Sequence, residues 1–220
     1  MNYKDIVNPR IFEIPDYDQI HVTKCWEDES IRRQMSNESN YAPIQAVQDA
    51  ICEAGKHANY YAEDATYAFS LRTKLADYCG VKMDNIALGN GSIELLDLLF
   101  QILLSNQGKD EAILLQPDYS AYVPRLTYFG WKVNYAKLSE GLDNAAAQVL
   151  DAINENTKFV LLSRPNNPMG FVMPSEEVRR MLDTGKVIIV DEAYIEMADE
   201  GTSVSKWINE YDNLIVMRTF

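Results

Sequence analysis

Residues 187–194 read Val-Ile-Ile-Val-Asp-Glu-Ala-Tyr, four aliphatic residues followed by two acids. A run that is apolar at every position is typical of a strand buried on both faces, as the central strands of parallel sheets are. Residues 159–162, Phe-Val-Leu-Leu, have the same character. The two runs predict the middle of a parallel sheet, with Asp191 at the carboxyl end of one strand.

Similar apolar runs recur along the chain, with a helical pattern between most of them. The predicted strands cover residues 85–88, 112–116, 132–136, 159–163, 187–190 and 214–218. The predicted helices cover residues 43–58, 64–78, 92–104, 119–128, 145–153, 175–182 and 204–210. Strands and helices that alternate at this spacing require right-handed crossovers. The sequence therefore predicts an α/β fold, a mostly parallel central sheet with helices on both faces.

The first forty residues lack this alternation. They are polar and irregular and contain Pro9 and Pro15. We expect residues 1–40 to form an N-terminal arm and residues 41–220 to form the main domain.

Composition and charge exclude several classes of protein. The 220 residues are 47% hydrophobic and 24% charged, as in an ordinary globular chain. The net charge of −13 argues against binding nucleic acid through a basic face. The longest apolar stretch, residues 95–104, is interrupted by Asp97 and Gln101 and is too short to cross a bilayer. We expect no nucleic acid and no membrane among its partners.

The three cysteines, Cys25, Cys52 and Cys79, are far apart, and none has a histidine at a metal-ligand spacing. We therefore expect no metal site. Unpaired cysteines and the lack of an apolar signal segment at the N-terminus favour a reduced, cytoplasmic location.

Ligands of open parallel sheets bind at the carboxyl ends of the strands. Gly89-Asn90-Gly91-Ser92 follows the first predicted strand and opens a helix. Glycine backbone and free N–H groups at a helix start can cradle a phosphate. Taken alone, the stretch is better explained as a tight turn capped by Ser92.

The other predicted strand ends also carry polar or aromatic groups. Asp191 is either a loop acid or a carboxylate held against a cationic ring nitrogen or a metal, and Tyr194 can face the same pocket. Asn167 lies in a turn. Tyr119 and Tyr122 are either packing aromatics or rings that stack on a flat ligand. Five strand ends that present such groups at one edge of one sheet favour a binding site.

These segments, in this order, resemble the class I/II aminotransferases, which are pyridoxal-phosphate enzymes with the aspartate-aminotransferase fold. The segments are Gly-Asn-Gly-Ser-Ile-Glu (89–94), Pro-Asp-Tyr (117–119), Pro-Asn-Asn-Pro-Met-Gly (165–170), Val-Asp-Glu-Ala-Tyr (190–194) and Met-Arg-Thr-Phe (217–220). Residues 35–43 make the chain most similar to the histidinol-phosphate aminotransferase group. The resemblance covers residues 35–220 and implies pyridoxal 5'-phosphate as the cofactor.

The resemblance also implies which residues bind that cofactor. The backbone of Gly91 and Ser92 would hold its phosphate, and Tyr119 would stack on its pyridine ring. Tyr61, or alternatively Tyr60, would reach the phosphate bound by the other subunit of a homodimer.

The catalytic residues implied by the resemblance are Asp191 and Tyr194. Asp191 would pair with the protonated pyridine nitrogen, while Asn167 and Tyr194 would hydrogen-bond the ring hydroxyl oxygen. A carboxylate at the nitrogen keeps the ring cationic, so that it accepts electrons when the substrate Cα–H bond breaks.

The implied reaction is amino-group transfer between an amino acid or a phosphorylated amino alcohol and a 2-oxo acid. Two alternatives remain open. One is a pyridoxal-phosphate decarboxylase of phosphorylated threonine, and the other is a non-catalytic domain that binds pyridoxal phosphate. A nucleotide-binding α/β domain is disfavoured, because Glu94 stands where the dinucleotide motif has its third glycine.

Several features depart from the family pattern. Met169 replaces the usual Thr and Arg164 the usual Asn. In the family, Thr-Phe is followed by Ser and the Schiff-base lysine, so we expect the sequence to stop just before that lysine and to lack the small C-terminal domain. Lys186 is expected at the wrong edge of the sheet to replace it. The family's next strand would lie between residues 214–218 and 85–88, so we expect the first strand to lack a neighbour.

Overall fold

The computed structural model describes residues 6–14, 20–39, 41–61, 68–105, 108–138 and 144–219. The chain divides into two compact units. One comprises residues up to Ile14 together with Ser70 onward, and the other comprises Pro15–Phe69. The predicted boundary between an arm and a main domain at residues 40 and 41 stays a prediction.

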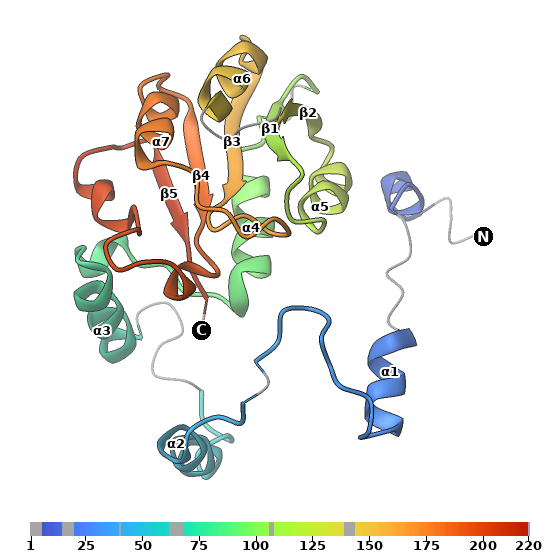
Figure 1. The fold of residues 1–220 in the computed structure, drawn as a ribbon, viewed down its shortest axis with the longest axis vertical. Helices are drawn as coiled ribbons and strands as arrows, with labels where there is room; N and C mark the ends of the chain where they lie inside the picture. Colours follow the sequence, from blue (N-terminus) through green and yellow to red (C-terminus); the bar gives the residue numbers. More distant parts are fainter. Residues whose placement is uncertain are drawn as a thin grey trace. The chain divides into compact units, whose positions relative to one another are not determined.

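The larger unit is built on a parallel sheet with helices packed against it (Figure 1). Its strands are β1 (Glu111–Gln116), β2 (Lys132–Lys137), β3 (Thr157–Ser163), β4 (Val187–Asp191) and β5 (Leu214–Met217). They lie in the order β2-β1-β3-β4-β5, and all four pairings are parallel. The α/β fold expected from the sequence is confirmed.

Some helices of this unit precede β1, and the others lie between consecutive strands. The α-helices are α3 (Phe69–Cys79), α4 (Gly91–Ile102), α5 (Tyr122–Phe129), α6 (Ala145–Ala152) and α7 (Ser175–Leu182). The 3-10 helices are η2 (Pro9–Phe12), η3 (Met83–Asn85), η5 (Ile195–Met197) and η6 (Ser205–Asn209). The predicted helix over residues 204–210 is therefore a 3-10 helix.

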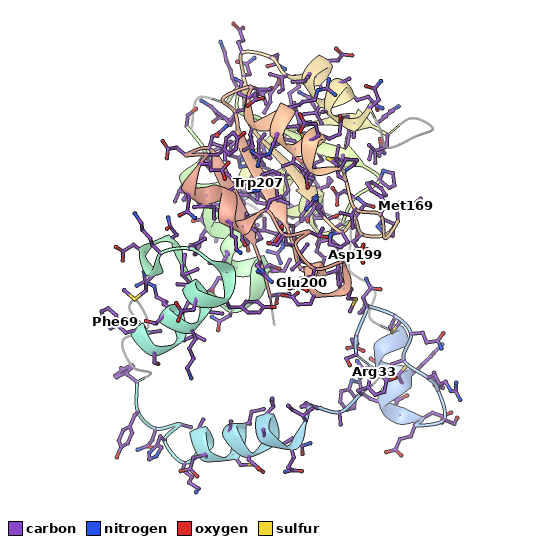
Figure 2. The ribbon with its side chains drawn as sticks, turned by 60° about the vertical axis from the view of Figure 1, so that its left-hand side comes forward. Arg33, Phe69, Met169, Asp199, Glu200 and Trp207 are labelled. Carbon is purple, nitrogen blue, oxygen red and sulfur yellow. The ribbon has the colours of Figure 1, made fainter. Side chains whose placement is uncertain are left out.

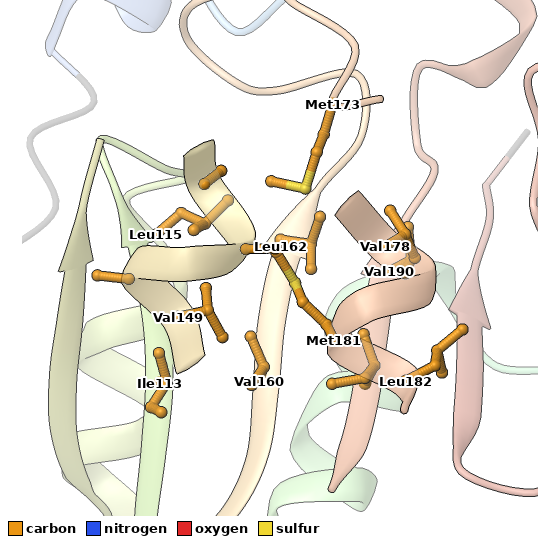
Figure 3. Close-up of a cluster of buried hydrophobic side chains, with 14 of the residues drawn as sticks. Ile113, Leu115, Val149, Val160, Leu162, Met173, Val178, Met181, Leu182 and Val190 are labelled. Carbon is orange, nitrogen blue, oxygen red and sulfur yellow. The ribbon is translucent and has the colours of Figure 1, made fainter. Parts of the chain in front are cut away.

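The side chains of β3 divide between two cores, one on each face of the sheet. Val160 and Leu162 pack with residues of α6 and α7, as Figure 3 shows. Phe159 and Leu161 point to the opposite face and pack with residues of α4 and α5. Successive side chains of a strand face opposite sides, so a strand covered on both sides needs an uninterrupted apolar run.

The smaller unit contains two helices and little buried surface. These are α1 (Ile20–Glu27) and α2 (Gln45–Gly55), and no residue of α2 is buried. Arg33 pairs with Glu38 at 2.7 Å and lies over the Trp26 ring. Across both units, no described helix is long and apolar enough to cross a membrane.

One predicted strand is wrong. Residues 86–89 adopt no regular structure and follow the 3-10 turn η3. Among the described residues β5 pairs only with β4, and no strand joins β5 to residues 86–89. A groove of about 850 Å³ lies there instead, lined by residues 85–89, α4 and β5. A strand needs a hydrogen-bonded neighbour, and its apolar sequence alone does not supply one.

Side-chain hydrogen bonds connect the segments at the amino edge of the sheet. Ser105 donates to the buried Asp110 carboxylate from both its backbone N and its Oγ, at 2.8 and 2.6 Å. Lys186, just before β4, donates from Nζ to the carbonyl oxygen of Thr157 at 2.9 Å. Lys186 therefore lies at the amino edge of the sheet, as expected from the sequence.

Candidate active site

Asp191, the last residue of β4, is only 4% exposed. Its Oδ2 accepts a hydrogen bond from the Tyr122 hydroxyl at 2.7 Å, and its Oδ1 accepts one from the Ala193 backbone N at 3.1 Å. Burial raises the pKa of Asp191 above its usual value, and these two hydrogen bonds partly oppose that shift. A buried carboxylate of this kind gains most from a cationic partner.

Tyr122, the first residue of α5, is fully buried and provides the side-chain hydrogen bond to Asp191. The sequence left this residue open between packing and ring stacking. Burial and the neighbouring Asp191 and Asp118 carboxylates raise its pKa well above the usual value for tyrosine. Tyr122 therefore stays protonated and acts as a hydrogen-bond donor.

Tyr119 lies in the loop after β1, and its ring meets the Tyr122 ring edge-on at a centroid distance of 5.3 Å. The preceding residue, Asp118, accepts hydrogen bonds from Tyr119 N at 2.8 Å, from Ser163 N at 3.2 Å and from Ser163 Oγ. Burial, with a smaller contribution from Asp191, raises the pKa of Asp118 to about 6. Sequence reasoning missed Asp118, whose partner Ser163 lies 45 residues away at the end of β3.

Asn167 lies in the loop after β3, where its backbone N donates to Ser163 Oγ at 2.9 Å. Met169 is 62% exposed on the same loop (Figure 2). Arg164 is buried, and its guanidinium donates to Met173 O, Thr202 O and Ser175 Oγ at 2.6 to 2.9 Å. Arg164 thus ties residues 173–175 and Thr202 to the end of β3.

Tyr194 follows Asp191 by three residues and caps the start of η5, where it is half-buried. The sequence expected it to face the same pocket as Asp191. Its predicted contact with a ring oxygen stays a prediction.

Gly91 begins α4 with a φ of +77°, a conformation that glycine adopts without strain. A Cβ added at Gly91 would meet no heavy atom within 4 Å, so the space in front of it is open. The N-terminus of α4, with Ser92 as its second residue, carries the partial positive charge that favours an anion. The Glu94 carboxylate accepts a hydrogen bond from the backbone N of Asn90, just before the helix.

The structure brings the residues after β1, β3 and β4 together at one edge, as the hydrogen bonds among Asp118, Tyr122, Ser163, Asn167 and Asp191 show.

The two tyrosines predicted to reach the cofactor of the other subunit belong to the smaller unit. There Tyr60 stacks on His57, and Tyr61 is fully exposed. Their role stays a prediction.

Among the described side chains no group of three His, Cys, Asp or Glu residues could hold a metal ion.

The family model for aminotransferase classes I and II matches residues 34–220. The chain belongs to this family. Its sequence is 32% identical to the histidinol-phosphate aminotransferase of Methanosarcina mazei, over 100% of this chain and 60% of that protein. Two other histidinol-phosphate aminotransferases, from Methanosarcina barkeri and Halalkalibacterium halodurans, are 31% and 30% identical. The resemblance seen in the sequence is confirmed, and the chain spans about 60% of the length of these relatives.

Solved aminotransferase structures share the fold. The aspartate aminotransferase of Thermus thermophilus with maleate superposes with a TM-score of 0.81, over 96% of this chain and 59% of that one, at 21% identity. The histidinol-phosphate aminotransferase of Sinorhizobium meliloti, in complex with pyridoxal 5'-phosphate, has a TM-score of 0.72 and 25% identity. That superposition covers 84% of this chain and 50% of the Sinorhizobium meliloti chain.

Proposed function

We propose that this chain forms the cofactor-binding part of a pyridoxal-phosphate-dependent aminotransferase. The single observation that carries the proposal is the Asp191 carboxylate, which is buried at the carboxyl edge of the sheet and accepts a hydrogen bond from Tyr122. The chain that carries it belongs to the aminotransferase family. The enzyme would transfer an amino group between an amino acid, or a phosphorylated amino alcohol such as histidinol phosphate, and a 2-oxo acid. The names of the relatives favour histidinol phosphate.

The residues at this edge fit the cofactor. Bound pyridoxal phosphate supplies an electron sink for the bond that breaks at the substrate Cα. Asp191 would face the pyridine nitrogen and hold a proton there, because an ionised carboxylate favours a cation beside it. Tyr122 would keep the carboxylate oriented, since it donates to Oδ2, while Oδ1 accepts a hydrogen bond only from Ala193 N among the described residues.

The remaining predicted residues would hold the rest of the ring. Tyr119 would stack on its face, and Asn167 and Tyr194 would hydrogen-bond its hydroxyl oxygen. The phosphate would lie at the start of α4, against the backbone of Gly91 and Ser92. The space in front of Gly91 is open, and a helix N-terminus favours an anion.

The proposed assembly is a homodimer in the cytoplasm, in which Tyr61 or Tyr60 of one subunit reaches the phosphate held by the other. Exposed apolar side chains of the smaller unit, Ile44, Val47 and Ile51 on α2 and just before it, support a surface that another subunit covers. Light scattering of the full-length protein should give twice the subunit mass.

An assay with the full-length protein tests the reaction. With pyridoxal phosphate, histidinol phosphate and 2-oxoglutarate, we expect glutamate to form at a rate that depends on both substrates. Release of carbon dioxide from phosphothreonine, with no glutamate, would favour the decarboxylase instead. A protein that binds the cofactor but turns over neither substrate would support the non-catalytic alternative.

A further inference from the structure

The hydroxyl of Ser163 joins two loops at the carboxyl edge of the sheet, the loop after β1 and the loop after β3. Ser163 ends β3 and lies beside Asp191 in the β3–β4 register. Its Oγ accepts hydrogen bonds from Asn167 N at 2.9 Å and from Asn166 Nδ2 at 3.4 Å, and it donates to Asp118 Oδ1. The loop after β1 is thereby connected to the loop that carries Asn167.

The direction of these hydrogen bonds is fixed by chemistry. A serine hydroxyl has one hydrogen and two lone pairs, and both lone pairs of Ser163 face N–H donors. Its hydrogen therefore requires an acceptor, and Asp118 Oδ1 provides one. The second oxygen, Oδ2, accepts Ser163 N at 3.2 Å, so both oxygens of residue 118 act as acceptors.

We propose that Asp118 and Ser163 are positioning residues for Asn167. The Asp118 carboxylate orients the Ser163 hydroxyl, that hydroxyl holds the backbone N of Asn167, and the fixed loop presents the Asn167 amide to the ring oxygen of the cofactor. The inference rests on the proposed function, because that function gives Asn167 its ligand.

The test uses the full-length protein with added pyridoxal phosphate. Ser163→Ala removes the hydroxyl and keeps the backbone N–H that meets Asp118. Two properties are measured: the cofactor affinity by fluorescence titration, and the pH midpoint of the visible absorbance change of the bound cofactor. A hydrogen bond to the ring oxygen stabilises its ionised form, so its loss should raise that midpoint. We expect affinity to fall about tenfold and the midpoint to rise by up to about one pH unit.

The chain offers a matched control at the other edge of the sheet. Ser105 donates to Asp110 from backbone N and Oγ, as Ser163 does to Asp118, but its hydrogen bonds within the described part of the chain reach no predicted site residue. Ser105→Ala should lower thermal stability and leave both cofactor properties unchanged. Asn167→Ala should cause a shift at least as large as that of Ser163→Ala. The double variant should add little to it, because the two residues act on one contact.

Two results would overturn the inference. One is a Ser163→Ala variant whose affinity and midpoint match those of Ser105→Ala, and the other is an effect of Ser163→Ala that persists in full when Asn167 is already alanine. Either result would leave the proposed function intact, provided that the unsubstituted protein binds the cofactor. Failure of the unsubstituted protein to bind pyridoxal phosphate would instead refute the proposed function, and the inference with it.

Discussion

Asp191→Asn is expected to lower the turnover of the full-length enzyme by roughly two to three orders of magnitude. The side chain keeps its size and still has an oxygen that accepts from the Tyr122 hydroxyl. The neutral amide no longer keeps the ring nitrogen protonated, so the cofactor becomes a weaker electron sink.

The fold of this variant should not suffer. Burial raises the pKa of Asp191 in the folded chain above its value in the unfolded chain. A group with a raised pKa stabilises the fold in its protonated form, and that contribution is lost as the pH rises through the folded-state pKa. At pH values above the folded-state pKa this stabilising contribution is absent from the unsubstituted protein, so Asp191→Asn does not remove it there. We expect a thermal midpoint close to that of the unsubstituted protein.

Steady-state kinetics and circular dichroism on the same preparations check both parts of this prediction. Asp199→Asn is the matched control, because Asp199 is an exposed acid beyond η5 (Figure 2). It should leave turnover unchanged. Near-normal turnover of Asp191→Asn would show that this carboxylate does not serve the ring nitrogen.

A polypeptide made of residues 1–220 alone is expected to lack a cooperative thermal transition. In the described part of the chain one edge of β5 has no partner strand, and residues 86–89 likewise pair with no strand. The groove between them is lined by aliphatic side chains of α4 and β5, among them the exposed Leu98 and the half-buried Ile215. Each unsatisfied backbone group costs about 1–3 kcal/mol once it is shielded from water. Several such groups use up much of a net stability of about 5–15 kcal/mol.

Circular dichroism during heating, with binding of a hydrophobic dye, measures this effect. The control is the full-length protein, in which we expect further residues to fill the groove. Sharp cooperative unfolding of a soluble 1–220 polypeptide that does not bind the dye would show that β5 and residues 86–89 need no added strand.

The central strands were predictable because their signal is local. Residues 159–163 and 187–190 are apolar at almost every position, and both faces of β3 and β4 are covered by helices. Residues 85–88 have a similar apolar character and still form no strand. Strand formation there depends on pairing with a distant segment, which a local pattern does not report.

In the candidate site, too, residues with a local sequence signal were predictable and residues that depend on distant partners were not. The placement of Asp191, Tyr119 and Asn167 at one edge was predictable because each follows an apolar run, and the carboxyl ends of parallel strands share one edge; their roles stay predictions. The roles of Tyr122 and Asp118 were missed. Their partners, Asp191 and Ser163, lie 69 and 45 residues away in sequence. The spacing of Tyr122 three residues after Tyr119 was the only local signal.

A crystal structure of the full-length protein with pyridoxal phosphate bound tests the central claim most directly. The measurement is the distance from the pyridine nitrogen to the nearer carboxylate oxygen of Asp191. We predict a hydrogen bond of about 2.7–3.2 Å, with the Tyr119 ring against the pyridine face and the phosphate at the start of α4. A cofactor bound elsewhere, or with its ring nitrogen turned away from Asp191, would contradict this account.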